Sequence, residues 1–299
     1  MRTRFLITGA AGFVGKQLVK RLIAQGHEVW CVDRVFHDFE SDLVKFTQAD
    51  VREMFLIDPE MFETAHTAIH LANLARIDPS WEKAIDYYDV NILGTLDFYR
   101  RCQRDGVPKF MYVSSSSVYG NNKFELQNET YPLSPTNPYA ISKQCAEQSL
   151  LAFANDTTDL LIVRPFTMYG TTMATEQNAL AIGKFVHAYK NKRPLTVHGT
   201  GDQQRDFIHV DEAIGAMLLL LDKGKRNNIY NIGTGKSVSI NEIVEVFNTS
   251  VVTAPGRPGP DYDTCADIDK LRALGFNPTV TLIDWLRNQL KQSFKEFEC

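Results

Sequence analysis

FLITGAAGFVG, residues 5–15, joins a short apolar run to three glycines spaced GxxGxxG. The apolar run at residues 5–7 predicts a buried strand. The residues after the motif carry apolar side chains at helical spacing, and this pattern stops at Gly26, a common helix C-cap. Glycines at a strand-to-helix turn are typical of a site that binds the pyrophosphate of a dinucleotide.

Each glycine of this motif has its own expected task. Gly9 permits the tight turn, and Gly12 lets the backbone approach the pyrophosphate. Gly15 lets the helix pack closely on the strand. The N-terminus of the helix then faces the phosphates. The stretch therefore predicts a dinucleotide-binding α/β domain.

Composition narrows the class of protein. With 299 residues, 44% of them hydrophobic and 23% charged, the chain is typical of soluble globular proteins and long enough for two lobes. A net charge of −4 gives no basis for binding nucleic acid or an anionic membrane. No signal-peptide pattern and no apolar run of membrane-spanning length is found. Five scattered cysteines without metal-like spacing predict reduced thiols, no metal site and a cytoplasmic location.

Acidic residues follow the next predicted strands. Residues 28–32 predict a second strand that ends at Asp33, at the distance from the last glycine where a carboxylate binds the adenosine ribose. Its charge would repel a 2′-phosphate, which favours NAD over NADP. Arg34 is the residue type that accommodates this phosphate, so NADP stays open. Asp50, beyond a third predicted strand at 45–48, is placed to contact adenine.

Further strands are predicted at residues 67–72 and 109–113, with an interrupted helical pattern at 81–104 between them. The strand at 109–113 leads directly into four serines, residues 114–117. Loops at the carboxyl ends of parallel strands line the ligand crevice, so the serines are candidate site residues. His70 is expected to be a core or loop residue rather than a catalyst.

NPYAISK, residues 137–143, predicts the start of a helix, with Asn137 as N-cap and Pro138 as first helical residue. Tyr139 and Lys143 are four residues apart, so their side chains share one helical face. A phenol has a pKa of about 10 and needs help to act as a base near neutrality. An ammonium group nearby, beside a cationic nicotinamide, would favour the phenolate.

The second half of the chain predicts a strand at residues 160–163 and a buried helix at 214–221. Two more helices are predicted near residues 240–247 and 282–290. This half is expected to cover the substrate.

In their order along the chain, these motifs resemble those of the extended short-chain dehydrogenase/reductases, specifically the NAD-dependent epimerase/dehydratase family that acts on nucleotide sugars. The motifs are TGAAGFVG (8–15), VDR (32–34), ADV (49–51), HLAN (70–73), VSSSSVYG (113–120), YAISK (139–143), RPFTMYG (164–170), RDFIHVDE (205–212), NIGTG (231–235) and RPGPDYDTCAD (257–267). The resemblance implies an α/β fold with a doubly wound parallel (Rossmann) sheet. Residues 1–165 would bind NAD, with segments around 205–232 packing back on this domain. Residues 166–299 would form a smaller α/β lobe for the nucleotide sugar.

The resemblance also implies roles for single residues. Tyr139 would be the general base on a sugar hydroxyl, Lys143 would hold the nicotinamide ribose, and Ser115 would hydrogen-bond the substrate oxygen. The implied NAD contacts are Gly9, Gly12, Phe13, Val14, Gly15, Asp33, Arg34, Asp50, Val51, Leu71, Ala72, Asn73, Tyr139, Lys143 and Pro165. The implied substrate contacts are Ser115, Ser116, Thr167, Asn178, Arg205, Arg257 and Thr264.

Departures from the family pattern bear on the reaction. Family dehydratases carry acids at the two positions after the catalytic serine, where this chain has Ser116 and Ser117, and this puts dehydration in doubt. Many relatives have asparagine where Thr167 stands, so that substrate contact is altered. Thr264 borders the 2-substituent of the sugar in the family register, and its small side chain would admit an N-acetyl group.

The sequence therefore favours NAD-dependent 4-epimerisation of a nucleotide-diphosphate sugar, preferably UDP-linked, through a transient 4-keto sugar. A keto-sugar reductase that spends NAD(P)H is the alternative. A dinucleotide sensor without catalysis is disfavoured by the intact set of Ser115, Tyr139 and Lys143. The family commonly forms homodimers through helices like those near residues 84–104 and 139–154, so a homodimer is expected.

Overall fold

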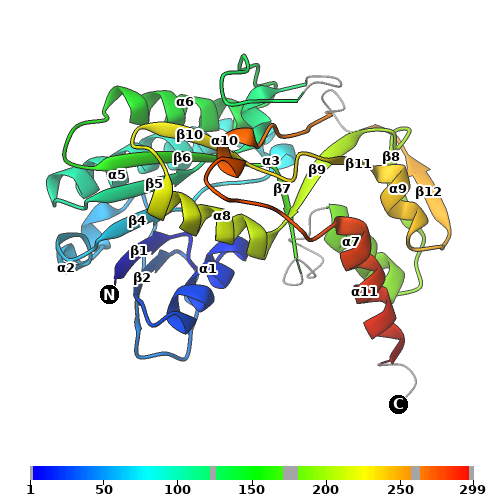
Figure 1. Cartoon of the computed structure of the whole chain (residues 1–299), viewed down its shortest axis with the longest axis horizontal. Helices are drawn as coiled ribbons and strands as arrows, with labels where there is room; N and C mark the ends of the chain where they lie inside the picture. Colours follow the sequence, from blue (N-terminus) through cyan, green and yellow to red (C-terminus); the bar gives the residue numbers. More distant parts are fainter. Residues whose placement is uncertain (1–2, 122–125, 171–180, 257–262, 296–299) are drawn as a thin grey trace. The chain divides into compact units, whose positions relative to one another are not determined.

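The computed structural model describes residues 3–121, 126–170, 181–256 and 263–295 (Figure 1). The chain divides into two units. The first contains Met1–Gly120, Pro132–Pro165 and Ile214–Tyr230, and the second contains Asn121–Tyr131, Phe166–Ala213 and Asn231–Cys299.

A seven-stranded sheet forms the centre of the first unit. Its strands are β1 (Arg4–Thr8), β2 (Glu28–Asp33), β3 (Val44–Gln48), β4 (Thr67–His70), β5 (Lys109–Val113), β6 (Asp159–Pro165) and β10 (Asn228–Ile232). The order across the sheet is β10-β6-β5-β4-β1-β2-β3, and β1 to β6 pair in parallel. Strand order reverses between β1 and β4, and ligands of such sheets bind outside the carboxyl ends of the strands at this point. The predicted doubly wound parallel sheet is confirmed.

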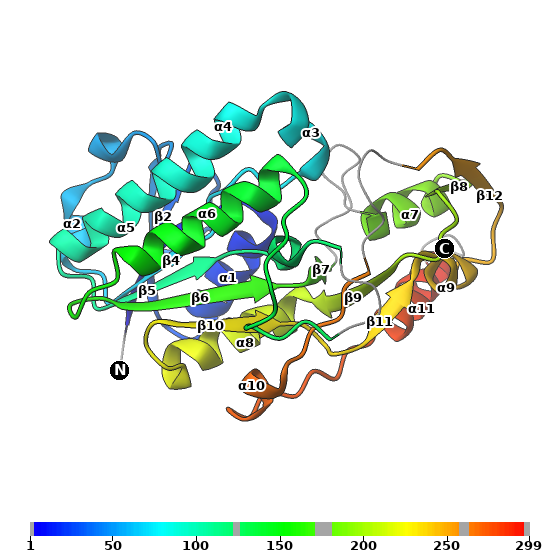
Figure 2. The same ribbon diagram turned by 90° about the horizontal axis from the view of Figure 1, so that it is seen from above.

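Helices cover both faces of this sheet. Helices α5 (Thr95–Arg104) and α6 (Pro138–Ala152) lie on one face, and α1 (Phe13–Ala24) and α8 (Val210–Lys223) lie on the other (Figures 1 and 2). Because both faces are covered, the central strands β1, β4 and β5 are mostly buried, and Leu6, Ile69 and Phe110 are fully buried.

The shorter helical elements of the first unit lie between β3 and α6. They are η1 (Met54–Leu56), α2 (Pro59–Glu63), α3 (Ile77–Glu82), α4 (Ala84–Tyr88), the π-helical η2 (Asp89–Gly94) and the 3₁₀ turn η3 (Ser116–Tyr119). The helical pattern expected at 81–104 is therefore several elements in the structure, and it begins earlier, at Ile77. Gly94 packs closely, because a Cβ there would lie 3.0 Å from Val51 Cγ2.

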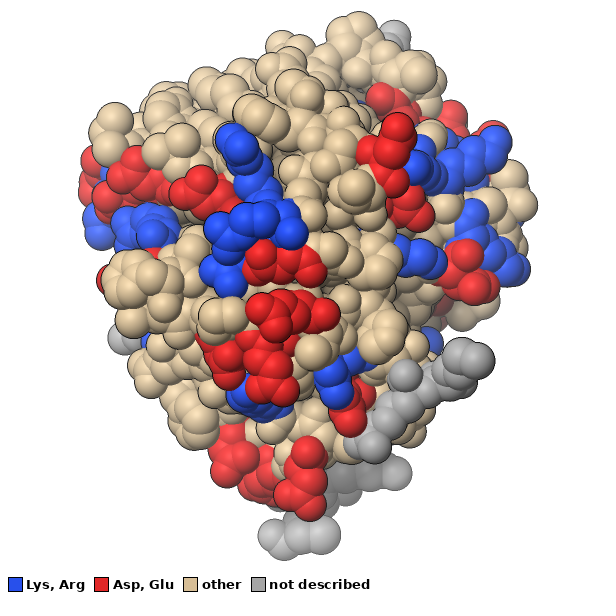
Figure 3. Space-filling model, turned by 90° about the vertical axis from the view of Figure 1, so that its left-hand side faces the viewer, with Lys and Arg blue, Asp and Glu red and all other residues tan. Residues whose placement is uncertain are grey.

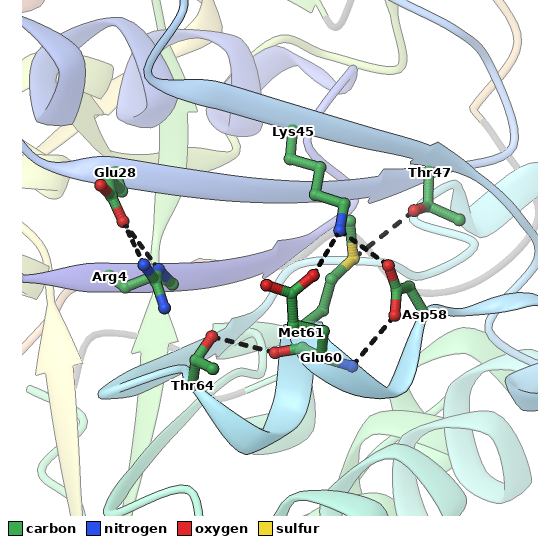
Figure 4. Close-up of polar contacts among 8 residues, drawn as sticks. All are labelled: Arg4, Glu28, Lys45, Thr47, Asp58, Glu60, Met61 and Thr64. Atoms are coloured by element: carbon green, nitrogen blue, oxygen red, sulfur yellow. Dashed lines mark hydrogen bonds and ion pairs between the residues drawn. The ribbon is translucent and has the colours of Figure 1, made fainter.

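Ion pairs tie the edge of the sheet to its surroundings (Figure 4). Arg4 on β1 lies 2.6 Å from Glu28 on β2. Lys45 on the edge strand β3 lies 2.7 Å from Asp58 and 3.0 Å from Glu60, which begin α2. Arg4 and Glu28 are partly exposed and the other three side chains are exposed, so each pair contributes little, about 0–1 kcal/mol. The two Lys45 pairs join β3 to the start of α2.

The second unit has smaller, mixed sheets. Its strands are β7 (Thr167–Tyr169), β8 (Leu195–His198), β9 (Gln204–His209), β11 (Ser237–Ser239) and β12 (Val251–Ala254). Strand β9 pairs in parallel with β7 and antiparallel with β11, and β8 pairs in parallel with β12. The helices are α7 (Ala181–Lys190), α9 (Ile240–Glu245), α10 (Asp269–Arg272) and α11 (Leu282–Lys295). The α/β class expected for this part of the chain is confirmed.

Three general features concern the helices, the groups that could bind a metal, and the surface charge. In the parts that the structure describes, every helix is too short or too polar to cross a lipid bilayer. Among the same residues, no group of three or more His, Cys, Asp and Glu side chains could hold a metal ion. On the face drawn in Figure 3, basic and acidic side chains lie interspersed rather than in one continuous field.

Candidate active site

The glycine turn after β1 is shaped to receive a phosphate group. Gly9 has φ +71°, a conformation that glycine adopts readily. A Cβ on Gly15 would lie 2.2 Å from the Gly9 carbonyl oxygen, so α1 approaches the turn at a distance only glycine allows. Gly12 is the N-cap of α1, and no acidic side chain lies in the first turn. Phe13, Val14 and Gly15 begin this helix, where N–H groups lack intrahelical acceptors and favour anions.

Asp33 lies next to this turn, at the end of β2. Its Oδ2 accepts a hydrogen bond of 3.0 Å from the Ala11 backbone N–H. Arg34 is mostly exposed, and its guanidinium lies 3.8 Å from Asp50 Oδ2. Arg52 donates to both Asp50 oxygens, at 3.0 and 2.9 Å, and this bond is the main cause that lowers the pKa of Asp50. The nearby carboxylates offset the positive charge that a 2′-phosphate would need, which fits NAD.

A pocket of about 560 Å³ extends from these residues. Its lining includes Arg34 and Asn73, two predicted NAD contacts, together with Arg52, Tyr87 and Val90. Asn73 Oδ1 is buried without a hydrogen-bond partner among the described atoms. A buried acceptor without a donor is rare in folded proteins, so a ligand that donates here fits the site. The glycine turn, Asp33 and Asn73 together fit NAD.

The residues after β4 continue this edge of the sheet. The backbone N–H of Leu71 donates to the Thr8 carbonyl oxygen at 3.1 Å, and that of Ala72 donates to Thr8 Oγ1 at 3.3 Å. The predicted NAD contacts at Leu71 and Ala72 are thus held beside the end of β1, where the strand order reverses. Pro165 is the last residue of β6, at the carboxyl end of that strand.

Helix α6 carries Tyr139 and Lys143 and begins where the sequence predicts. Asn137 Oδ1 accepts a hydrogen bond of 2.9 Å from the Ala140 N–H, and Pro138 is the first helical residue. Both Tyr139 and Lys143 are buried, at 8% and 1% exposure. A buried phenol and a buried ammonium one helical turn apart are unusual, and perturbed groups of this kind cluster at functional sites.

Lys143 is held by the end of β5. Its Nζ donates to the Val113 carbonyl oxygen at 2.7 Å and lies 4.4 Å from the centre of the Tyr112 ring. Burial lowers the pKa of Lys143 to about 7, and the charge of Glu147 acts against this lowering. Burial raises the pKa of Tyr139, while a hydrogen bond from Ser115 lowers it. Burial therefore outweighs the lowering of the Tyr139 pKa that the sequence leads one to expect from Lys143.

The serine run places Ser115 next to Tyr139. Ser115 is the N-cap of η3, and its Oγ accepts hydrogen bonds from the Ser117 N–H at 3.2 Å and from the Ser117 hydroxyl at 2.9 Å. The Ser115 side chain also acts on Tyr139 on α6, where it lowers the pKa of the phenol. The structure thus brings together the three predicted catalytic residues, with Ser116 buried in the same turn. A base, a hydroxyl donor and a cation at the end of a parallel sheet suit proton removal coupled to hydride transfer.

A buried ion pair beneath these residues is absent from the sequence-based predictions. Arg164 on β6 donates to both carboxylate oxygens of Glu147 on α6, with Nη2 2.6 Å from Oε2, and to the Tyr119 hydroxyl at 3.0 Å. The side chains of Arg164 and Glu147 are each 2% exposed. Arg164 therefore connects α6, which carries Tyr139, with η3, at whose start Ser115 lies. The signal in the sequence was a glutamate one helical turn after Lys143 and an arginine in a strand.

Asn91 is a second positioning residue, in the segment 81–104 where the predicted helical pattern is interrupted. Its Oδ1 accepts from the Leu74 N–H at 2.8 Å, and its Nδ2 donates to the Leu74 carbonyl oxygen and to Ser142 Oγ, at 3.1 and 2.9 Å. Asn91 lies in the π-helical η2, and π turns often occur at functional sites. It fixes the loop after β4 and helix α6 relative to each other.

His70 is a core residue, as the sequence predicts. Its ring nitrogens lie 2.8 Å from Thr8 Oγ1 and 3.0 Å from Thr95 Oγ1. Burial lowers its pKa to about 3, so the ring is neutral near pH 7. A neutral histidine between two hydroxyls is a structural element of the sheet.

In the second unit, Arg205 and Thr264 are brought together at β9. The Arg205 guanidinium donates to the Gln204 carbonyl oxygen at 2.8 Å, and the Thr264 N–H donates to the same oxygen at 3.1 Å. Thr264 is 8% exposed, and its Oγ1 is buried without a partner among the described atoms. Two other predicted substrate residues, Asn178 and Arg257, lie outside the described residues. Thr167 begins β7.

Asp206 anchors this region and was not predicted. Its Oδ1 accepts from the Thr234 N–H and hydroxyl, at 2.8 and 2.7 Å. Its Oδ2 accepts from the Gly235 and Ala266 N–H groups, at 2.9 and 3.1 Å. Asp206 is fully buried, and burial raises its pKa. It holds the segment that contains Thr264 against β9.

Comparison with known proteins adds three findings. The family model described as "NAD dependent epimerase/dehydratase family" matches residues 5–233. The chain is 28% identical to a putative UDP-glucose 4-epimerase of Methanocaldococcus jannaschii, covering 95% of this chain and 98% of that one. It is 27% identical to the dTDP-D-glucose 4,6-dehydratase of Mus musculus, covering 98% and 89%. The structure of MoeE5 in complex with UDP-glucuronic acid and NAD is similar, with a TM-score of 0.88, 30% identity and coverage of 98% and 99%.

Proposed function

The chain belongs to the NAD-dependent epimerase/dehydratase family, so it is an enzyme that uses NAD to modify a nucleotide sugar, and we propose that it is a 4-epimerase of a UDP-linked hexose or N-acetylhexosamine. Relatives include both epimerases and dehydratases. The observation that carries the choice is the turn after Ser115, where Ser116 and Ser117 stand in place of the acids of dehydratases and Ser117 is bonded to Ser115.

The proposed reaction assigns each residue of the first unit a task. Tyr139 accepts the proton of the sugar 4-hydroxyl, and Ser115 donates a hydrogen bond to the same oxygen. Lys143 binds the nicotinamide ribose, and its charge favours the Tyr139 phenolate. Bound NAD would supply reversible hydride transfer at C4, with no net consumption of the cofactor. Tyr139 then returns the proton to the 4-oxygen.

The remaining predicted contacts complete this proposal. The first unit would hold NAD at the glycine turn, Asp33 and Asn73. The second unit would hold the nucleotide sugar, with the Arg205 guanidinium on the diphosphate, because its planar fork matches phosphate oxygens. Asn178 and Arg257 remain proposals for the nucleotide.

The primary test is turnover of UDP-glucose and UDP-N-acetylglucosamine by the purified protein, with both 4-epimers quantified by NMR. Tyr139→Phe should retain NAD binding and lower kcat about 10²-fold or more, the scale of general base catalysis. NAD that co-purifies with the protein and supports turnover without added cofactor would support an epimerase. Turnover that requires a stoichiometric supply of reduced cofactor would identify the alternative, a keto-sugar reductase.

The size of the Thr264 side chain allows a proposal about the sugar. This position would border the 2-substituent, so a small side chain admits an N-acetyl group. Thr264→Tyr should abolish turnover of the N-acetylhexosamine and spare that of the hexose, because overpacking a tight site costs about 1–3 kcal/mol. Thr264→Val, which keeps the size and removes the unpartnered hydroxyl, is the matched control and should retain both activities. An unchanged preference in Thr264→Tyr would place this residue away from the sugar.

We also propose a homodimer through the outer helices of the first unit. Ile85 on α4 is 70% exposed and Leu93 on η2 is 57% exposed, and Ile141 on α6 is exposed as well. Exposed apolar side chains on packed helices are typical of an interface. Ile85→Asp with Leu93→Asp should convert a dimer to monomer in analytical ultracentrifugation. Phe55→Asp, at an 81% exposed position on η1, is the control and should leave the dimer intact.

A further inference from the structure

The hydroxyl of Ser117 is directed at Ser115 rather than toward solvent. Ser115 Oγ accepts both the Ser117 N–H, at 3.2 Å, and the Ser117 O–H, at 2.9 Å. A serine hydroxyl has two acceptor lone pairs and one proton. With both acceptor positions filled by Ser117, the remaining capacity of Ser115 is to donate its own proton. The neighbouring serine therefore determines the direction of the Ser115 hydrogen bond.

Tyr139 on α6 is the neighbour on which the Ser115 side chain acts. Burial raises the pKa of Tyr139, and the Ser115 side chain acts to lower it. An O–H that donates to the phenol oxygen stabilises its anionic form, whereas an O–H that accepts from the phenol stabilises the neutral form. Whether Ser115 donates or accepts thus affects how readily Tyr139 becomes a base.

The turn that carries both serines is firmly held. The Val118 N–H donates to the Ser115 carbonyl oxygen at 3.4 Å, and Tyr119 is bonded to the buried Arg164. A Cβ on Gly120 would lie 1.8 Å from the Ser134 carbonyl oxygen, so the end of the turn is closely packed. The Ser117 hydroxyl therefore has a fixed position relative to Ser115.

We propose that Ser117 is a positioning residue of the epimerase reaction: its N–H and O–H occupy the acceptor sites of Ser115, so that Ser115 donates its single proton toward Tyr139 in the free site and toward the 4-oxygen once the sugar is bound. This inference rests on the proposed function for the substrate part and on the Ser117–Ser115–Tyr139 contacts for the rest. Ser117 acts through Ser115 and needs no contact with the sugar.

The first test needs no substrate. The Tyr139 phenolate is titrated by ultraviolet difference spectroscopy on the NAD-bound protein, with Tyr139→Phe as the reference that isolates its signal. Tyr87 on α4 and Tyr112 on β5 act on Tyr139 from the neighbouring elements, and Lys143 lies one turn along α6. Burial raises the pKa of both Tyr87 and Tyr112. Ser117→Ala should shift the titration of Tyr139 to higher pH, and Ser117→Thr, which keeps the hydroxyl, should restore it. An unshifted titration in Ser117→Ala would overturn the proposal.

The second test is a double-mutant cycle on turnover. Ser117→Ala should lower kcat about 3- to 10-fold, the range of one hydrogen bond, with KM changed less than about twofold. In the Ser115→Ala background the same substitution should have no further effect, because Ser117 acts through Ser115. Equal effects in both backgrounds would show that Ser117 contacts the substrate by itself, and would overturn the proposal.

Ser149 on α6 provides a matched control, because its hydroxyl bonds within its own helix. Ser149 Oγ donates to the Cys145 carbonyl oxygen at 2.8 Å. Ser149→Ala should change neither the Tyr139 titration nor kcat. If no nucleotide sugar is turned over by the wild type, the proposed function fails, and the titration still decides whether Ser117 controls Ser115 and Tyr139.

Discussion

Each unit of the molecule buries charged side chains, and Arg164 in the first unit and Asp206 in the second are stabilised in different ways. In the first unit, Arg164 meets the carboxylate of Glu147 with both side chains 2% exposed. In the second unit, Asp206 is buried and accepts four hydrogen bonds from neutral N–H and O–H groups. Arg164 joins two structural elements of the proposed catalytic region, and Asp206 joins two loops next to the proposed sugar site.

The difference shows in the pKa values. The carboxylate of Glu147 raises the pKa of Arg164, so the arginine stays charged. Burial raises the pKa of Asp206 despite its four hydrogen bonds, because neutral dipoles compensate a lost hydration shell less fully than an opposite charge does. The rigidity of the proposed catalytic region therefore depends on the Arg164–Glu147 pair. The rigidity of the region around Asp206 depends on the placement of neutral N–H and O–H donors.

The largest effect is expected from breaking the matched pair. Arg164→Met leaves Glu147 buried without its partner and should lower the free energy of unfolding by about 3–5 kcal/mol. Hydrogen exchange in β5 and α6 should accelerate with it. The double variant Arg164→Met with Glu147→Leu removes both charges and should recover most of the loss, because an apolar pair of similar volume carries no desolvation cost. A double variant as unstable as the single one would show that the pair is not what stabilises this region.

A smaller effect is expected at the anion of the second unit. Asp206→Asn keeps the shape but turns an amide NH₂ toward N–H donors, and should lower the free energy of unfolding by about 2–3 kcal/mol. Because the pKa of Asp206 is raised in the folded state, the folded protein binds this proton more tightly than the unfolded chain. The advantage of the wild type over Asp206→Asn should then decrease as pH rises above about 3.8. Denaturant unfolding of both proteins at acidic and neutral pH tests the sign.

His70 offers a third way to carry a buried titratable group, as a neutral ring. Its folded-state pKa of about 3 is below the ordinary value of 6.5, so the unfolded chain binds more protons between these values. Stability should therefore fall as pH drops below about 6.5, by up to about 1.4 kcal/mol per pH unit from this residue. Comparison with His70→Gln at pH values between 5 and 7 checks this. Equal slopes would mean that His70 is not the group responsible.

The smallest effects are expected at the helix caps, one in each unit. Asn137 caps α6, and Ser239 forms a capping box with Glu242 at the start of α9. Asn137→Ala and Ser239→Ala should each cost about 1 kcal/mol. Thermal unfolding measures both. A loss of kcat in Asn137→Ala but not in Ser239→Ala would locate the catalytic residues on α6.

The fold was largely predictable because its signals are local. Buried parallel strands are short apolar runs, and β5 occupies the predicted residues 109–113. The N-cap at Asn137 and the positive φ of Gly26 are likewise set by single residues. These features arise from chain geometry over a few positions, which periodicity and capping rules detect.

The supporting contacts of the site were not predictable in the same way. The Asn91–Ser142 bond and the Arg164–Glu147 pair join residues far apart in sequence. Nothing local indicates which glutamate a buried arginine meets. The Ser117–Ser115 bond is local, but a run of four serines does not reveal which hydroxyl donates to which. Such partners become visible only when the sheet brings the segments together.

The π-helical turn at Asp89–Gly94 has a consequence for insertions and deletions. A π turn contains one more residue than the α-helical turn it replaces, and each residue of an α-helix turns by about 100°. Deleting one residue here would relax the turn to a regular helix and rotate Asn91 away from Leu74. The register of α5 would be little changed, so the fold should survive while the loop after β4 loses its anchor. A one-residue deletion in this turn should therefore preserve the fold and misalign the residues of the proposed active site.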